Sequence, residues 1–90
     1  MNADAAVTEV EIWSRTIRPE VGDLSTATAR DLLRLQLSAA DADRVRELSA
    51  RANEGTLSPA EADELDHYLN VGRALEFLKT KARLSLNAAA

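Results

Sequence analysis

The sequence predicts an all-α protein, a small bundle of three to five helices in a single domain over residues 1–90. Apolar residues recur at spacings of three and four along most of the chain. Strand signals are weak, because the only short alternation of apolar and polar residues is Val10-Glu11-Ile12. The two prolines and three glycines fall where helices would begin or end. We expect residues 1–4 to be disordered and residues 87–90 to be frayed.

The first helix is predicted over residues 5–17. Pro19 marks its end, because proline disfavours a helical conformation in the residue before it. One face of this helix would carry the apolar residues Val7, Val10, Trp13 and Ile17.

Three further helix starts share one local pattern, a leucine followed by a serine. Ser25, Ser38 and Ser58 are the predicted N-caps, since a serine hydroxyl accepts a hydrogen bond from an N–H group of the first turn. Asp41 and Glu61 lie three residues after their caps, where a carboxylate can accept a hydrogen bond from the cap's own N–H. The unequal offsets of 13 and 20 residues between the leucines favour recurrent capping over an internal repeat.

Two of these starts predict helices over residues 26–36 and 39–54. The first would bury a stripe of Ala29, Leu32, Leu33 and Gln36. The second would bury Ala42, Val45, Leu48, Ser49 and Ala52. Gly55 follows it as the residue whose left-handed conformation ends the helix.

The last helical segment is predicted from Pro59 to Leu86. The apolar residues of its two halves lie about a quarter turn apart around the helix axis, which exceeds the drift of about 20° per heptad in a straight helix. We predict a break near Asn70 to Gly72. The alternative is one straight helix with neighbours on two sides, because an isolated glycine costs a helix only about 1 kcal/mol.

Composition limits the classes of function that this chain can have. A net charge of −4 argues against nucleic acid as the main partner. The absence of cysteine excludes disulfides and thiolate metal sites. Nucleophilic catalysis needs a nucleophile beside an oriented base, and one histidine with serines in capping positions does not supply it. We predict no catalytic residues, no enzymatic activity and no cofactor.

Two short motifs resemble parts of metal sites, but the residues around them do not complete a set of ligands. His67 follows Glu64 at a spacing that metal sites in helical bundles use, but such sites need a second pair. Gly55 and Glu61 match the second half of a calcium-binding loop, whereas the first two ligand positions fall on Ala50 and Ala52. We therefore predict no bound metal.

Targeting signals are equally weak. The first residues are acidic, whereas a secretory signal would be basic there, and no charge-free run approaches the length of a membrane span. We expect a cytoplasmic protein with no membrane partner.

The segment after Gly72 carries the candidate partner-binding residues. Phe77 and Leu84 lie seven residues apart on a face that neither apolar stripe occupies, and we expect a partner protein or a second copy to cover them. The alternative is a cover supplied by the first helix. Lys81 and Arg83, with Lys79, form a basic patch that would serve the second candidate function, a nucleic-acid-binding regulator.

Several motifs resemble a group of short uncharacterised bacterial helical proteins. Their shared pattern reads EGTLTPEE, then ELdxY, then LxxKARxSL, and the likeness covers about residues 12–87. The matching stretches here are Glu54–Glu61, Glu64–Leu69 and Lys81–Leu86. Some members lie beside genes for small HNH-type nucleases, so the resemblance implies an accessory or antitoxin-like role. It supports the leading expectation of a non-catalytic helical module that binds a partner protein.

Overall fold

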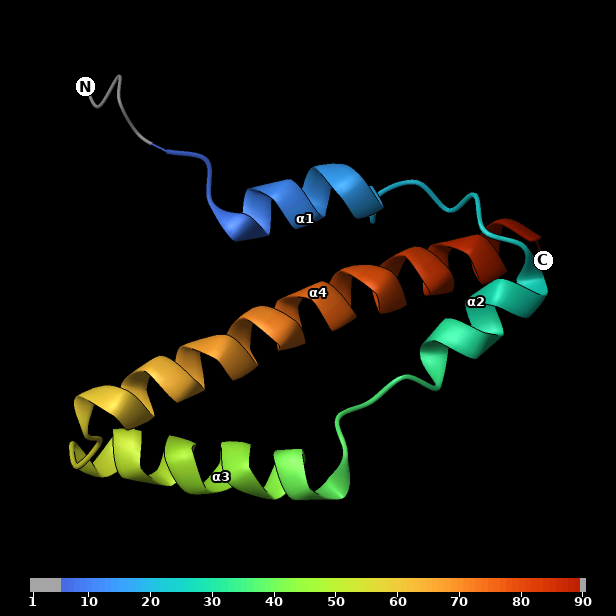
Figure 1. Cartoon of the computed structure of the whole chain (residues 1–90). Coiled ribbons are helices and arrows are strands. Elements are labelled where there is room, and N and C mark those ends of the chain that lie inside the picture. Colours follow the sequence, from blue (N-terminus) through green and yellow to red (C-terminus); the bar gives the residue numbers. More distant parts are fainter. Residues whose placement is uncertain (1–5, 90) are drawn as a thin grey trace.

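The computed structural model describes residues 6–89, which form four α-helices (Figure 1). These are α1 (Glu9–Ile17), α2 (Thr26–Leu33), α3 (Ala39–Glu54) and α4 (Pro59–Ala89). Over this part of the chain there is no strand, so the predicted all-α fold is confirmed. The disorder predicted for residues 1–4 and the fraying predicted at residue 90 lie outside the described residues.

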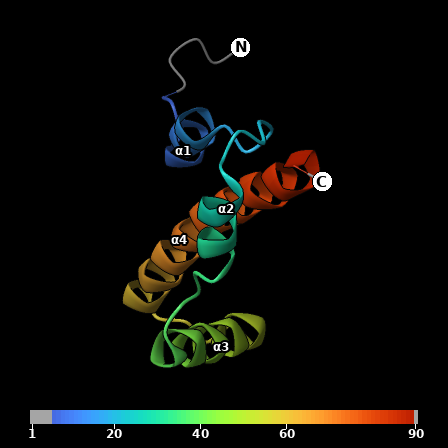
Figure 2. The same ribbon diagram turned by 90° about the vertical axis from the view of Figure 1, so that its right-hand side faces the viewer.

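Helix α4 is the spine of the molecule. Each of the other three helices contacts α4, and none of those three contacts another. α3 runs antiparallel to the first half of α4, while α1 and α2 pack farther along it (Figure 1). In Figures 1 and 2, α1 and α3 lie on opposite sides of α4. The four helices therefore form a bundle in which α4 is the shared member, and α1, α2 and α3 make no contacts with one another.

This arrangement is flat and open. The Cα atoms extend over 47 × 41 × 15 Å and have a radius of gyration of 16.3 Å. A compact domain of this length would have a radius of gyration of about 12 Å. The chain thus leaves far more of its helix surface uncovered than a compact four-helix bundle would.

Helix α4 continues through the position of the predicted break. It runs unbroken over 31 residues, so the break near Asn70 to Gly72 is wrong and the alternative of one helix with two sets of neighbours holds. Because α1 and α3 lie on opposite sides of α4, its neighbours account for the change in apolar direction without a break in the helix. Gly72 has open space where a Cβ would stand, so no neighbour requires a glycine there.

Capping sets the helix starts as the sequence predicts. The Oγ atoms of Ser25 and Ser38 accept hydrogen bonds of 3.2 and 3.1 Å from N–H groups three residues on. Ser58 and Glu61 form the complete reciprocal box, with distances of 3.0 and 3.1 Å. Asp41 differs from the prediction, because its carboxylate accepts from the hydroxyl of Ser38 at 3.0 Å and not from the backbone.

Helix ends follow the prediction less closely. α3 has the predicted bounds, and Gly55 ends it with a φ of 71°. α1 starts four residues later than predicted, because Thr8 and Glu11 form a capping box there. α2 ends at Leu33, which leaves Gln36 exposed and outside the helix. α4 continues three residues past the predicted end at Leu86.

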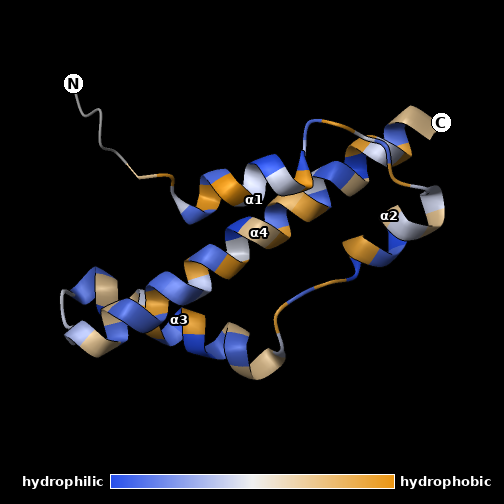
Figure 3. Cartoon of the chain, turned by 45° about the horizontal axis from the view of Figure 1, so that its top comes forward, coloured by the Kyte–Doolittle hydropathy of each residue, from blue (hydrophilic) through white to orange (hydrophobic). Residues whose placement is uncertain are grey.

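The buried core is small. The buried apolar residues are Ile17, Ala29, Leu48 and Ala82. Only one of the thirteen leucines is among them. Apolar and polar residues are interspersed along every helix (Figure 3). Four residues of the predicted apolar faces are exposed: Val7, Trp13, Gln36 and Ala52. The buried interior is thus confined to a few positions where the other helices and the loop before α2 contact α4, and most large apolar side chains are only partly buried.

Candidate binding surface

The most deeply placed charge in the molecule belongs to Lys81. Its exposed fraction is 9%, and its Nζ donates hydrogen bonds to the carbonyl oxygens of Val21 at 2.9 Å and Arg18 at 3.3 Å. The same Nζ lies 2.7 Å from Oδ1 of Asp23. Lys81 therefore fastens the loop between α1 and α2 to α4, and it is not free to meet a phosphate or a partner.

Ser85 and Gly22 complete this attachment one turn farther along. The Ser85 hydroxyl accepts a hydrogen bond of 3.1 Å from the N–H of Leu24 and donates one of 2.7 Å to the carbonyl of Lys81. A Cβ on Gly22 would stand 2.6 Å from the carbonyl carbon of Leu84, so only glycine lets the loop approach so closely. We call Gly22, Asp23, Lys81 and Ser85 the loop clasp. No local pattern predicts it, because Lys81 bonds to residues 63 and 60 positions earlier in the chain.

Of the two charged side chains in the loop clasp, Asp23 is exposed and Lys81 is buried. Asp23 remains mostly open to solvent, and its hydrogen bond to Lys81 lowers the pKa of its carboxyl below the usual 3.8. The anion is therefore the form that the fold favours. This pairing accounts for the charges of both side chains within the chain.

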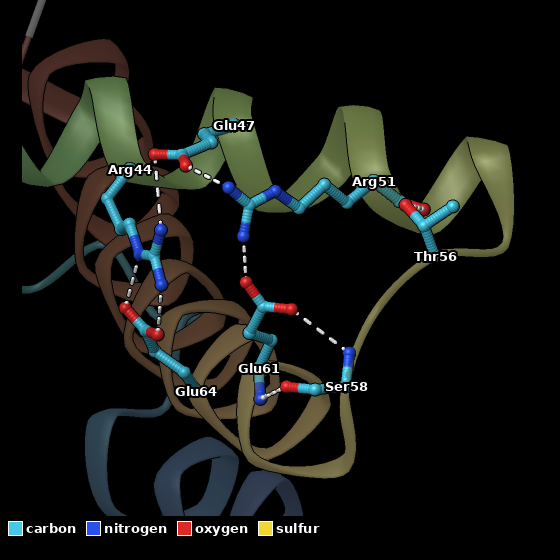
Figure 4. Close-up of polar contacts among 7 residues, drawn as sticks. All are labelled: Arg44, Glu47, Arg51, Thr56, Ser58, Glu61 and Glu64. Atoms are coloured by element: carbon cyan, nitrogen blue, oxygen red, sulfur yellow. Dashed lines mark hydrogen bonds and ion pairs between the residues drawn. The ribbon is translucent and has the colours of Figure 1, made fainter.

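A second polar cluster joins α3 to α4 (Figure 4). Arg44 donates from Nε and Nη2 to the two oxygens of Glu64, at 2.7 and 2.8 Å. Arg51 pairs with Glu61 and, at 2.6 Å, with Glu47, which also lies 3.1 Å from Arg44. The bidentate bond from Arg44 lowers the pKa of Glu64. These arginines and carboxylates satisfy one another and fix the hairpin of α3 and α4.

Tyr68 anchors the other end of the same hairpin. Its hydroxyl donates a 2.7 Å hydrogen bond to Oδ1 of Asp41 at the start of α3. This bond to a carboxylate raises the pKa of Tyr68 above 10.0, because ionisation would destroy the donor. The neutral hydroxyl therefore belongs to the structure of the hairpin.

The four predicted partner-binding residues differ in how far they are exposed. Phe77 is half-buried and lines a hollow with Val10 and Ser14, so α1 supplies part of its cover. Leu84 is 38% exposed. Lys81 is in the interior, and Arg83 is exposed with a 2.6 Å ion pair to Glu76.

The sequence did not single out a second hollow between α1 and α4, which lies nearer the start of α1. We call it the α1–α4 groove; it has a volume of about 260 Å³, and its lining is mostly apolar. Trp13 forms the α1 side, and Val71, Leu75 and Leu78 lie along the α4 side. Trp13 is 39% exposed and Val71 is 49% exposed, which is high for side chains of this kind beside a helix contact.

Few polar groups border this groove. Glu9 and Asn70 are its polar members, and the carboxylate of Glu9 accepts a 3.2 Å hydrogen bond from Nε1 of Trp13. That bond holds the indole ring at the edge of the groove with its polar atom satisfied. The groove is suited to apolar contact and carries no cluster of ionisable groups for chemistry.

Within residues 6–89, no group of three or more histidine, aspartate or glutamate side chains is placed to hold a metal ion. Glu61, the acidic residue of the half calcium motif, bonds to Arg51 and to the N–H of Ser58. No described helix is both long enough and apolar enough to span a membrane.

Comparisons with protein-family models, with curated proteins and with solved structures find no match to this chain.

Proposed function

We propose that the chain is a non-catalytic interaction module that binds another polypeptide through the α1–α4 groove. The observation that carries the proposal is the exposure of Trp13 and Val71 on either side of an apolar hollow, in a chain that buries few large side chains. Aromatic and aliphatic side chains around a hollow are the usual anchors of protein interfaces. We expect the module to work in the cytoplasm, and an accessory or antitoxin-like role is one form that such binding would take.

The charges of the molecule support a binding role over a catalytic one. The arginines and carboxylates between α3 and α4 pair with one another, and Lys81 is used by the loop clasp. The groove itself has a single ionisable residue, Glu9, which is bonded to Trp13. Catalysis by acid and base would need ionisable groups that converge on a substrate.

Structure weakens the second candidate function, a nucleic-acid-binding regulator. Of the basic residues that suggested it, Lys81 lies in the interior and Arg83 pairs with Glu76. Phosphate binding depends on the number of free cations that reach the backbone. In the part of the chain that the structure describes, no observation favours this function.

Site-specific crosslinking in living cells tests the proposal. A photo-reactive benzophenone amino acid would replace Val71 in the groove and, as the matched control, Leu69. Leu69 is 45% exposed, close to the 49% of Val71, but lies about 200° away around α4. We expect a discrete crosslinked product from position 71 and none from position 69. No product from position 71, or equal products from both positions, would show that the groove binds no polypeptide.

A further inference from the structure

The folded chain exposes more surface than a compact monomer of the same mass would. The chain exposes 6309 Å² of surface. A compact monomer of 9.8 kDa would expose about 5,200 Å². The difference, about 1,100 Å², exceeds the roughly 800 Å² that one partner buries in a standard interface and matches the lower end of obligate homodimers, about 1,000 Å² per partner. One contact of the obligate-dimer size would thus bring the exposed area to that of a compact domain.

The uncovered surface includes the middle of α4. Toward the C-terminal end, the loop clasp covers this helix, and Ala82 and Ser85 are buried there. Near its middle, α4 contacts α1, and the α1–α4 groove lies between them. Val71 remains half-exposed there, and Trp13 is exposed at the edge of the same groove.

We propose that a second copy of this chain occupies the α1–α4 groove, so that the protein is a symmetric dimer joined through α1 and α4. The inference rests on the proposed function and names the partner. A chain of this size with one buried leucine has little core of its own, so the cover must be present whenever the chain is folded. A second copy is the one polypeptide that is always synthesised with it.

Symmetry makes the groove a suitable dimer contact. In a two-fold interface each surface meets its own equivalent, so the Trp13 and Val71 pair of one copy would pack on the same pair of the other. Ile12, which is exposed on α1 beside Trp13, would lie at the border of the same contact. The fold would then gain an apolar layer between two copies of α4, which the isolated chain lacks.

Two measurements on the purified full chain test this inference without any substitution. Light scattering after size-exclusion chromatography should give twice the chain mass of 9.8 kDa. Trp13 is the only tryptophan, so its emission maximum should shift to longer wavelength on dilution, as the dimer separates and the indole meets water. A mass of one chain, with an emission maximum that does not depend on concentration, would overturn the inference.

A matched pair of variants then locates the interface. Val71→Asp places a charge in the groove, and Leu69→Asp places the same charge on an equally exposed site outside it. Both add an aspartate inside α4, so their helix-propensity cost is similar. We expect V71D to lose at least tenfold in dimer affinity with its helical circular dichroism retained, and L69D to remain dimeric. Equal loss in both variants, or no loss in V71D, would place the contact elsewhere and overturn the assignment.

If V71D does not fold, the dilution experiment on Trp13 in the unaltered chain still decides between dimer and monomer. The crosslinking experiment separates this inference from the proposed function. A product of two copies supports both. A product of one copy with a different protein, from a chain that is monomeric when purified, keeps the interaction module and refutes the dimer. No product at all, with a monomeric chain, refutes both.

Discussion

Lys81 donates a 2.9 Å hydrogen bond to the carbonyl of Val21, a residue 60 positions earlier in the chain. Together with the 2.7 Å ion pair between Lys81 and Asp23, this hydrogen bond attaches the segment between α1 and α2 to the C-terminal half of α4. It is a long-range bond to a charged donor in a nearly buried setting, so it belongs to the strong class of hydrogen bonds.

Replacing Lys81 with Met should destabilise the fold by roughly 1.5 to 3 kcal/mol, the range for hydrogen bonds to charged groups. The substitution keeps the length of the side chain but removes the Lys81 donor from the carbonyl of Val21, and it leaves the carbonyl of Arg18 with only the N–H of Val21 as donor. Thermal and urea unfolding would measure the change. Lys79→Met, two residues away and outside the loop clasp, is the control and should change stability little. Equal effects of the two substitutions would contradict the role of Lys81.

Gly22→Ala and Gly72→Ala should move stability in opposite directions. At Gly22 the new Cβ would meet the backbone of Leu84 at 2.6 Å, and forcing it in should cost about 1 to 3 kcal/mol. At Gly72 the space is open and the backbone is helical, so alanine should stabilise by about 1 kcal/mol. Chemical denaturation of both variants checks this. A stabilising Gly22→Ala would mean that the loop does not lie against α4.

Ser58→Ala should destabilise the protein by about 1 kcal/mol. The Ser58 hydroxyl accepts the N–H of Glu61 at 3.1 Å, and no other hydrogen bond is known to satisfy that donor at the start of α4. The thermal midpoint is the readout. Ser49→Ala, in the interior of α3, is a useful comparison because its serine is not at a cap. An unchanged midpoint for Ser58→Ala would show that the cap contributes nothing.

Gly55→Ala should cost about 1 to 2 kcal/mol, because the residue has a φ of 71° and a Cβ is strained in this region. No heavy atom lies within 4 Å of the position of that Cβ, so the backbone conformation alone accounts for the cost. Asn, which tolerates the left-handed region better than Ala, should recover part of the loss. Denaturant midpoints for the two variants would be compared, and a more stable Gly55→Ala would refute the left-handed turn.

Acid should weaken the fold through its paired carboxylates. Hydrogen bonds lower the pKa of Glu64 below 4.5 and that of Asp23 below 3.8. A group whose pKa is lower in the folded state adds stability above its unfolded pKa and loses it as the pH falls through the folded value. The thermal midpoint should therefore fall as the pH drops from about 5 to about 3.

Glu64→Gln is the control for this pH dependence. It should lower the midpoint at neutral pH, because an amide has one acceptor oxygen and cannot form the bidentate pair with Arg44, and it should reduce the slope in acid, because the amide does not titrate. Asp23 would keep part of the slope. An identical acid slope in the variant would show that the pair does not contribute.

The sequence by itself determined the helices and most of their ends. Caps such as Ser58 with Glu61, and the left-handed Gly55, act over three or four residues, so the local sequence specifies them almost completely. The bounds of α3 follow from this. Where a competing cap stood nearby, as with Thr8 at the start of α1, the local reading placed the boundary wrongly.

Tertiary structure alone decided which side chains meet across long separations. Nothing local distinguishes Lys81 from a solvated basic residue, because its partners at Arg18 and Val21 lie more than 50 residues away and appear only when the loop is folded onto α4. The same is true of the change in apolar direction along α4, which reflects neighbours on opposite sides of that helix, and not a break in it. The α1–α4 groove likewise arises where α1 packs on α4, a relationship that depends on packing geometry and not on helical periodicity.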